Sequence, residues 1–247
     1  MYLADNPDNY NILLYKSGLL VVSKPVYCDP EREVRTARER KYIIKRSAVR
    51  SACIDAWEKR RTKFMFFFTV TMPRAVNETD CARAWELFLN NLRKNYKITS
   101  YVWVKERQKN SRLHYHIIVD RNRINAKKLQ ATWENSFKTI TGFTHNFHNS
   151  VRLGRDPVVR SIKAVCNYLS KYFAKDCNGN LRTYSKRCFG NSNGIQFKRN
   201  ITEAEFKKIW VNCRIKLVFE HSFFNVYQVV DFFDVAFHWK NLPDPPE

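Results

Sequence analysis

Runs of hydrophobic residues and their spacing divide the middle of the chain into alternating strands and helices. The aromatic and β-branched run at 64–71 predicts a buried strand. Apolar residues at i, i+3, i+4 and i+7 spacing then predict a helix that begins near Thr79 or Asp80. Two further strands are predicted at 101–107 and 113–120, and the polar loop between them indicates a hairpin.

Helices are predicted on either side of these strands. A stretch without Gly or Pro predicts a helix over 31–61, and Asn125 can cap another. A short strand at 150–153 precedes a predicted helix over 158–175, and a capping box predicts a helix over 202–211. A central hairpin with helices outside it indicates the α+β class, with a central antiparallel sheet of about five strands flanked by helices.

The length of the chain sets its domain organisation. A chain of 247 residues suits one large domain, or one domain with extensions. We expect a basic, helical N-terminal extension over 1–60 and a core over 61–180. A second helical extension over 181–247 is expected to pack on that core.

Charge changes this picture most. Lys and Arg number 44 against 23 Asp and Glu, which gives a net charge of +21. Most of the excess lies in two blocks, 31–63 with net +7 and 150–199 with net +9. Such an excess favours a nucleic-acid partner. The blocks are either two walls of one groove or two solvated faces, and their density favours the groove.

Nothing in the sequence indicates a membrane or a secreted protein. The N-terminus is polar rather than a signal peptide, and the longest apolar stretch, 64–72, is far shorter than the ~20 residues of a membrane span. The seven Cys are odd in number and show no CxxC spacing. We therefore expect reduced cysteines and a cytoplasmic location.

The predicted hairpin carries a candidate metal site. His114 and His116 point to the same face of their strand, ~6.6 Å apart at ~3.3 Å per residue. If the hairpin turns about Asn110, Glu106 lies opposite His114 on that face, whereas a register slip of one residue would remove it. Two imidazoles and a carboxylate suit Mn²⁺ or Mg²⁺. The alternative is a pair of ordinary surface or core histidines.

The predicted helix at 158–175 carries a tandem YxxK pattern. Tyr168 and Tyr172 lie one turn apart at the rim of the apolar stripe, with Lys171 and Lys175 beside them on the wet side. A phenol has a pKa of ~10 and needs a nearby ammonium or metal to attack a phosphate. The alternative is two rim tyrosines that cover the core while the lysines reach into solvent.

Together, these motifs resemble the HUH single-strand endonucleases, specifically rolling-circle replication initiators. The Phe-rich strand, the His114-Tyr115-His116 pattern with an upstream acid, and the tyrosine helix occur in the family's order. The double tyrosine most resembles initiators of microvirus-type single-stranded DNA phages and some plasmid relatives. The resemblance covers roughly 64–175 and implies a ferredoxin- or RRM-like core. Tyr115 departs from the bulky apolar residue usual between the histidines.

The resemblance implies a metal-dependent endonuclease and DNA strand transferase. His114, His116 and Glu106 would bind a divalent metal, Mn²⁺ or Mg²⁺. Tyr168 or Tyr172 would attack the scissile phosphate and leave a 5′-phosphotyrosine and a free 3′-OH. The second tyrosine would then allow cutting of the regenerated origin and rejoining of the strands.

Other residues take supporting roles under the same resemblance. Lys171 and Lys175 would steady the phosphate or phenolate, and Arg152, Arg155 and Arg160 would line the path of single-stranded origin DNA. The sequence has no P-loop, so we expect a host helicase to unwind the DNA and a host polymerase to extend the 3′-OH. The cytoplasm of a bacterial host is the expected location.

Alternatives remain open at this point. An HUH transposase of an insertion sequence is usually shorter and carries one tyrosine. A non-catalytic single-stranded nucleic-acid-binding protein on a ferredoxin-like sheet would show no metal-dependent covalent capture of DNA. The basic block 31–63 is expected to hold the DNA backbone non-specifically, through contacts that salt weakens.

Overall fold

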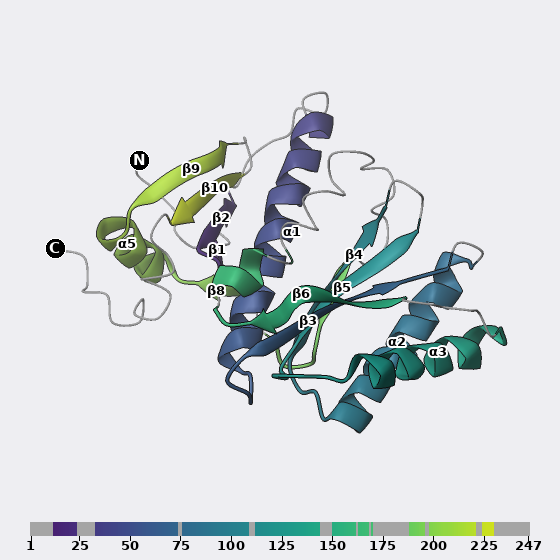
Figure 1. The fold of residues 1–247 in the computed structure, drawn as a ribbon. Helices are drawn as coiled ribbons and strands as arrows, with labels where there is room; N and C mark the ends of the chain where they lie inside the picture. Colours follow the sequence, from purple (N-terminus) through teal and green to yellow (C-terminus); the bar gives the residue numbers. More distant parts are fainter. Residues whose placement is uncertain are drawn as a thin grey trace. The chain divides into compact units, whose positions relative to one another are not determined.

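The chain divides into two compact units, whose helices and strands are drawn in Figure 1. One consists of residues 1–51 and 196–247 and the other of residues 52–195, and each contains its own antiparallel sheet. The predicted boundaries near residues 60 and 180 stay a prediction. The computed structural model describes residues 12–23, 33–73, 76–108, 112–143, 150–161, 163–167, 169, 188–195, 198–220 and 224–229.

The unit of residues 52–195 is built on a five-stranded sheet in the order β6-β3-β5-β4-β7. All neighbouring strands pair antiparallel. The segment from β3 to β6 follows the β-α-β-β-α-β connectivity of ferredoxin-like folds. The predicted α+β class and central antiparallel sheet flanked by helices are confirmed. The elements are β3 (Met65–Thr71), α2 (Glu78–Tyr96), β4 (Tyr101–Arg107), β5 (Leu113–Val119), α3 (Ala126–Thr141), β6 (Val151–Val159) and β7 (Phe189–Asn191).

Local capping explains where α2 and α3 begin and end. The Asn77 side chain accepts a hydrogen bond from the backbone N–H of Asp80 at 2.8 Å, so α2 starts slightly earlier than predicted. Asn125 caps α3 as predicted and accepts from the N–H of Lys128 at 3.1 Å. Gly142 ends α3 with φ 73°, a left-handed conformation that glycine adopts without strain.

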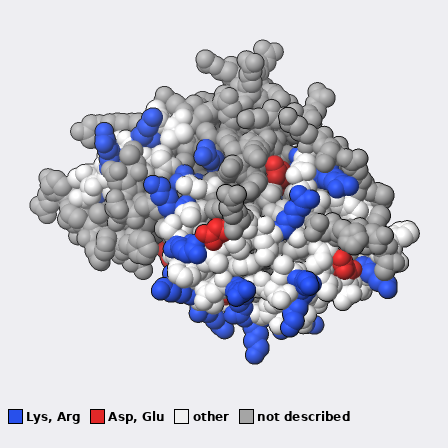
Figure 2. Space-filling view, in the orientation of Figure 1, with Lys and Arg blue, Asp and Glu red and all other residues white. Residues whose placement is uncertain are grey.

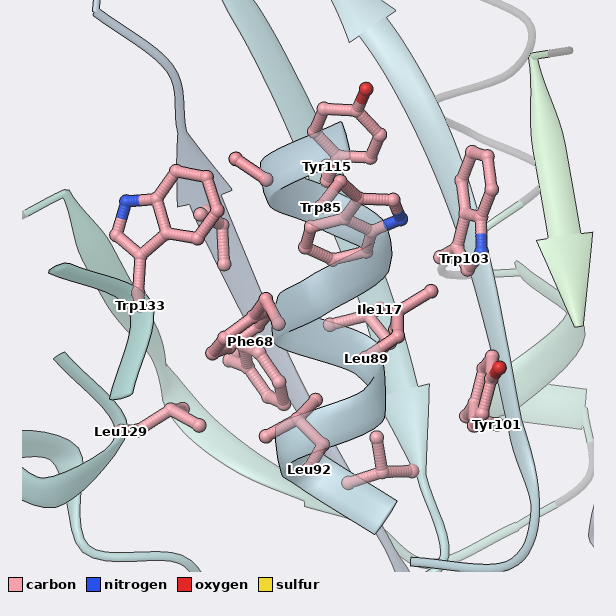
Figure 3. Packing of buried hydrophobic residues seen from close by; sticks show 14 of the residues in the cluster. Phe68, Trp85, Leu89, Leu92, Tyr101, Trp103, Tyr115, Ile117, Leu129 and Trp133 are labelled. Carbon is pink, nitrogen blue, oxygen red and sulfur yellow. The ribbon is translucent and has the colours of Figure 1, made fainter. Parts of the chain in front are cut away.

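Aromatic side chains fill the space between this sheet and helices α2 and α3 (Figure 3). Trp85 of α2 stacks on Tyr115 of β5, with ring centroids 4.2 Å apart and an interplanar angle of 24°. Phe88 meets Phe68 and Trp133 edge-on, at 6.4 and 5.5 Å. Burial raises the pKa of the Tyr115 phenol well above its ordinary value, so this tyrosine is a core residue.

The other unit contains a second five-stranded sheet, in the order β8-β1-β2-β10-β9. The prediction of purely helical extensions is therefore wrong. The strands escaped prediction because they are short and pair across long sequence separations, as β1 does with β8. The elements are β1 (Ile12–Tyr15), β2 (Leu19–Ser23), α1 (Glu33–Glu58), β8 (Lys198–Ile201), α5 (Glu203–Asn212), β9 (Ile215–Glu220) and β10 (Phe224–Val229), with α1 crossing the boundary between units.

The helices predicted at both ends of the chain are confirmed. Helix α1 lies within the predicted 31–61. Helix α5 begins with the predicted capping box, in which Thr202 accepts from the N–H of Glu205 at 3.2 Å and the Glu205 carboxylate accepts from the N–H of Thr202 at 2.9 Å.

The start of the helix predicted at 158–175 requires a correction. Val158 and Val159 belong to β6, which is longer than the predicted 150–153 strand. Helical structure is described only from residue 163, after Ser161. The Ser161 hydroxyl accepts from the N–H of Ala164 at 3.2 Å, which is a helix cap that the apolar periodicity obscured. The two β-branched valines favour the strand.

Candidate functional site

The β4–β5 hairpin holds the candidate metal ligands in the predicted register. Glu106 is the direct partner of His114, and Val104 is the partner of His116. Directly opposed residues share a face of the sheet, so both histidines and Glu106 lie on the face away from the aromatic core. The two imidazole centroids are 6.2 Å apart. Thr69 of β3 lies opposite His116 on the other side.

His116 is held by hydrogen bonds at both ring nitrogens. Its Nε2–H donates to the Glu106 carboxylate at 2.6 Å, and its Nδ1 accepts from the Thr69 hydroxyl at 3.0 Å. The ring of Phe67 lies parallel to it, with centroids 6.2 Å apart and an interplanar angle of 4°. The His116 and Glu106 side chains are only 5% and 12% exposed. This pairing fixes the orientation of the imidazole.

His114 is held at one nitrogen only. The Gln108 amide donates to its Nδ1 at 3.2 Å. Its Nε2 is buried and has no hydrogen-bond partner among the described residues, although the whole residue is 8% exposed. Burial lowers the pKa of His114 from 6.5 to about 4, and a positive charge on His116, Arg152 or Arg112 would lower it further, while Glu106 opposes the shift. The ring is therefore neutral at physiological pH.

This donor set fits a divalent cation. A neutral imidazole with an unsatisfied Nε2, a second imidazole and a carboxylate are ligands suited to Mn²⁺ among other metals. In the described part of the chain, no three or more His, Cys, Asp or Glu side chains are already drawn together as a metal site. Glu106 bonds to His116 instead, so binding would require this carboxylate to turn.

Thr69 and Gln108 were not predicted as site residues. Each holds the Nδ1 atom of one histidine, which leaves the Nε2 atoms for other partners. Both can reverse their role, because a hydroxyl rotates and an amide offers its oxygen after a flip. For Thr69, the alternation of the 64–71 strand could have given the signal, because it places this residue opposite Phe68 and away from the core. Gln108 lies just beyond β4, where no periodicity applies.

The predicted DNA-contacting arginines have different surroundings. Arg152 is exposed on β6 directly opposite Thr69, and it lies close enough to His114 for its charge to lower that pKa. Arg160 is exposed and pairs with Asp156 at 2.6 Å. The side chain of Arg155 lies outside the described residues.

The predicted nucleophiles cannot be located. Residues 163–167 and 169 are helical, and Val165, Cys166 and Leu169 are buried, as the predicted apolar stripe requires. Tyr168, Lys171, Tyr172 and Lys175 lie outside the described residues.

Comparison with known proteins supports a replication-associated role. Residues 65–177, a little under half of the chain, match the model of a family described as replication-associated protein, of the ORF2 type. Neither the curated proteins nor the solved structures gave a match. None of the helices formed by described residues has the length and apolar character needed to cross a membrane. The family match spans β3 to β6, the histidine hairpin and the tyrosine motif, and it supports a rolling-circle replication initiator.

Proposed function

We propose that this protein initiates rolling-circle replication by nicking single-stranded DNA at an origin through a tyrosine nucleophile. The buried face that holds His114, His116 and Glu106, with the unsatisfied Nε2 of His114, carries this proposal. A buried polar atom without a partner costs about 1–3 kcal/mol, so its retention favours a ligand. The family match over the same segment supports a replication role.

In this proposal, His114, His116 and Glu106 hold Mn²⁺ or Mg²⁺. The bound metal polarises the scissile phosphate and stabilises the charge that develops on it. Thr69 and Gln108 fix the two imidazole rings through their Nδ1 atoms, as partners of metal-binding histidines commonly do.

The covalent step uses Tyr168 or Tyr172. The phenolic oxygen attacks phosphorus, the bond from phosphorus to the 3′ oxygen breaks, and the phenolic proton ends on the new 3′-OH. The products are a 5′-phosphotyrosine and a primer end, with no net hydrolysis. Two tyrosines allow the second to act on the regenerated origin and rejoin the strands. Lys171 and Lys175 lower the cost of forming the phenolate or steady the phosphate.

The remaining predicted partners belong to the same proposal. Arg152, Arg155 and Arg160 line the path of the strand. A host helicase unwinds the duplex and a host polymerase extends the 3′-OH, in the cytoplasm of a bacterial cell.

Covalent capture of DNA tests the proposal. Purified protein is mixed with single-stranded oligonucleotides from its own replicon, in Mn²⁺ or EDTA, and run on a denaturing gel. We expect a metal-dependent shifted band that vanishes in Tyr168→Phe/Tyr172→Phe, while each single variant reveals which tyrosine acts first. Tyr96→Phe is the matched control, because its hydroxyl contacts Thr132 of α3 at 3.1 Å.

The alternatives predict other results. Tight binding without a covalent band in any metal would favour a non-catalytic binding protein. Covalent capture of transposon ends but not of an origin would favour an insertion-sequence transposase.

A further inference from the structure

One end of the β6-β3-β5-β4-β7 sheet lies far from the histidines and brings three separate segments together. Met65 at the start of β3 pairs with Val159 near the end of β6, and Phe66 pairs with Val119 at the end of β5. The segments before β3 and after β5 and β6 therefore meet here. The backbone N–H of Phe64 donates to the Asn122 side chain at 2.9 Å, which ties two of these segments.

Basic side chains gather around Phe64 at this end. Lys63 Nζ lies 5.4 Å from the centroid of the Phe64 ring, and Arg160 Cζ lies 5.9 Å from it. Arg61 and Arg123 are exposed in the adjoining segments. We call this set the Phe64 patch; its members are Arg60, Arg61, Lys63, Arg123 and Arg160.

The patch is partly ordered before any ligand arrives. Arg60 stacks on Trp57 at 3.7 Å and donates from Nε to the carbonyl of Lys63 at 3.3 Å. Contacts with aromatic rings hold cations in place and remove part of their hydration. Less ordering entropy is then lost when they bind an anion.

Acidic residues do not neutralise this surface. Asp156 pairs with Arg160 at 2.6 Å, and buried Asp55 pairs with Lys59 at 2.7 Å. Glu58 is a further exposed acid nearby in sequence. Figure 2 shows Lys and Arg dominating the lower left of the described surface, over the region where Figure 1 shows β3 beginning. Arg61, Lys63 and Arg123 have no carboxylate within ion-pairing distance among the described residues.

We propose that the Phe64 patch is a second DNA-binding site, which grips the sugar–phosphate backbone at a distance from the cleavage site. Phe64 lies five residues before Thr69, the partner of His116, so the patch is about 16 Å from the histidines at ~3.3 Å per residue. That distance equals about five phosphates along one strand of a duplex. The patch rests on the proposed function only in taking DNA as its ligand.

The test measures binding rather than cleavage. The dissociation constant is followed against salt concentration for wild type, Arg61→Gln/Lys63→Gln and Arg123→Gln in EDTA. Arg83→Gln/Lys94→Gln removes two exposed charges from α2 and serves as the matched control. We expect the double patch variant to bind about tenfold more weakly near physiological salt. The slope of log K against log salt should be reduced by about 1.4 for single strands or 1.8 for duplex.

Oligonucleotide length separates this site from the histidine face. The loss should appear on a long oligonucleotide and vanish on one too short to reach 16 Å beyond the cut. An extended single strand and a hairpin with a duplex stem show which form of backbone the patch holds, and a loss on either supports the proposal. Equal slopes for patch and control variants would overturn it, as would an equal loss on the short oligonucleotide.

Failure of this proposal is distinguishable from failure of the nicking proposal. The double patch variant should still form the covalent band at saturating DNA, whereas Tyr168→Phe/Tyr172→Phe should lose the band and keep the salt slope. Unchanged circular dichroism and thermal unfolding in the patch variants show that they fold. The Arg61→Lys/Lys63→Arg variant should recover the slope, because phosphate binding here needs charge rather than one side-chain shape.

Discussion

The two faces of β5 are both buried, yet they are built from opposite kinds of side chain. Leu113, Tyr115, Ile117 and Val119 point into the aromatic core beneath α2 and α3. On the other face of the same strand, the buried histidines contact Glu106, Thr69 and Gln108. The alternation of the strand therefore separates a stabilising face from a polar one, residue by residue.

The difference lies in how completely each face is satisfied. On the core face, rings stack at ordinary distances, and burial stabilises the fold at about 25 cal/mol per Å² of apolar surface. On the polar face, His114 Nε2 lacks a partner among the described residues, and burial suppresses protonation of the ring. A face that costs stability and is nevertheless buried indicates selection for binding rather than for folding.

Removing a ring from the core face should have the largest effect on stability. Trp85 is 2% exposed and stacks on Tyr115, so Trp85→Ala leaves a cavity in the core. We expect the free energy of unfolding to fall by about 3–5 kcal/mol. Urea unfolding followed by circular dichroism measures this. Trp210→Ala is the control, because Trp210 is 39% exposed and should cost much less; equal losses would show that burial does not set the difference.

Replacing a histidine on the polar face should have the reverse signature. His114→Leu fills a similar volume and removes the unsatisfied Nε2, so stability should stay or rise by about 1 kcal/mol. Metal-dependent covalent capture of DNA should fall by more than about a hundredfold. Ile118→Leu, on the same face of β5, should change neither property strongly. Full capture by His114→Leu would remove His114 from the ligand set.

Sequence periodicity predicted this contrast well, because both faces of a hairpin follow from alternation and register. The partnership of Glu106 with His114 needed only the position of the turn. The hydrogen bond from His116 to Glu106 was not predictable, because the carboxylate reaches diagonally across the pair. Patterns also failed at the end of β6, where apolar residues suit strand and helix equally, and in the second sheet, whose strands pair over long separations.

Acidification should weaken the folded state through the polar face in particular. The pKa of His114 is 6.5 ordinarily and about 4 in the folded chain, so below pH 6.5 the unfolded chain binds a proton that the folded chain does not. Stability contributed by the neutral ring is therefore complete above pH 6.5 and is lost as the pH falls toward 4. For metal-free protein, we expect this residue to account for a loss of about 2 kcal/mol between about pH 7 and pH 5.

Urea unfolding at several pH values in EDTA checks the size of this term. The matched comparison is His114→Leu, which lacks the titrating ring and should show a correspondingly shallower dependence of stability on pH. Identical pH dependence in the two proteins would mean that His114 is protonated at its ordinary pKa and that the face is less dry than its burial implies.

The smallest expected effect concerns the residues that hold the imidazoles without touching a metal. Gln108→Leu removes the partner of His114 Nδ1, and Thr69→Val removes that of His116 Nδ1. The freed rings can rotate, so Mn²⁺ affinity measured by titration calorimetry should fall about tenfold in each variant. Gln108→Glu and Thr69→Ser keep an acceptor for the Nδ1–H of a metal-bound ring and should recover most of the affinity. A merely structural role would instead lower stability without this pattern of rescue, because the conservative variants differ from the apolar ones in hydrogen bonding far more than in packing.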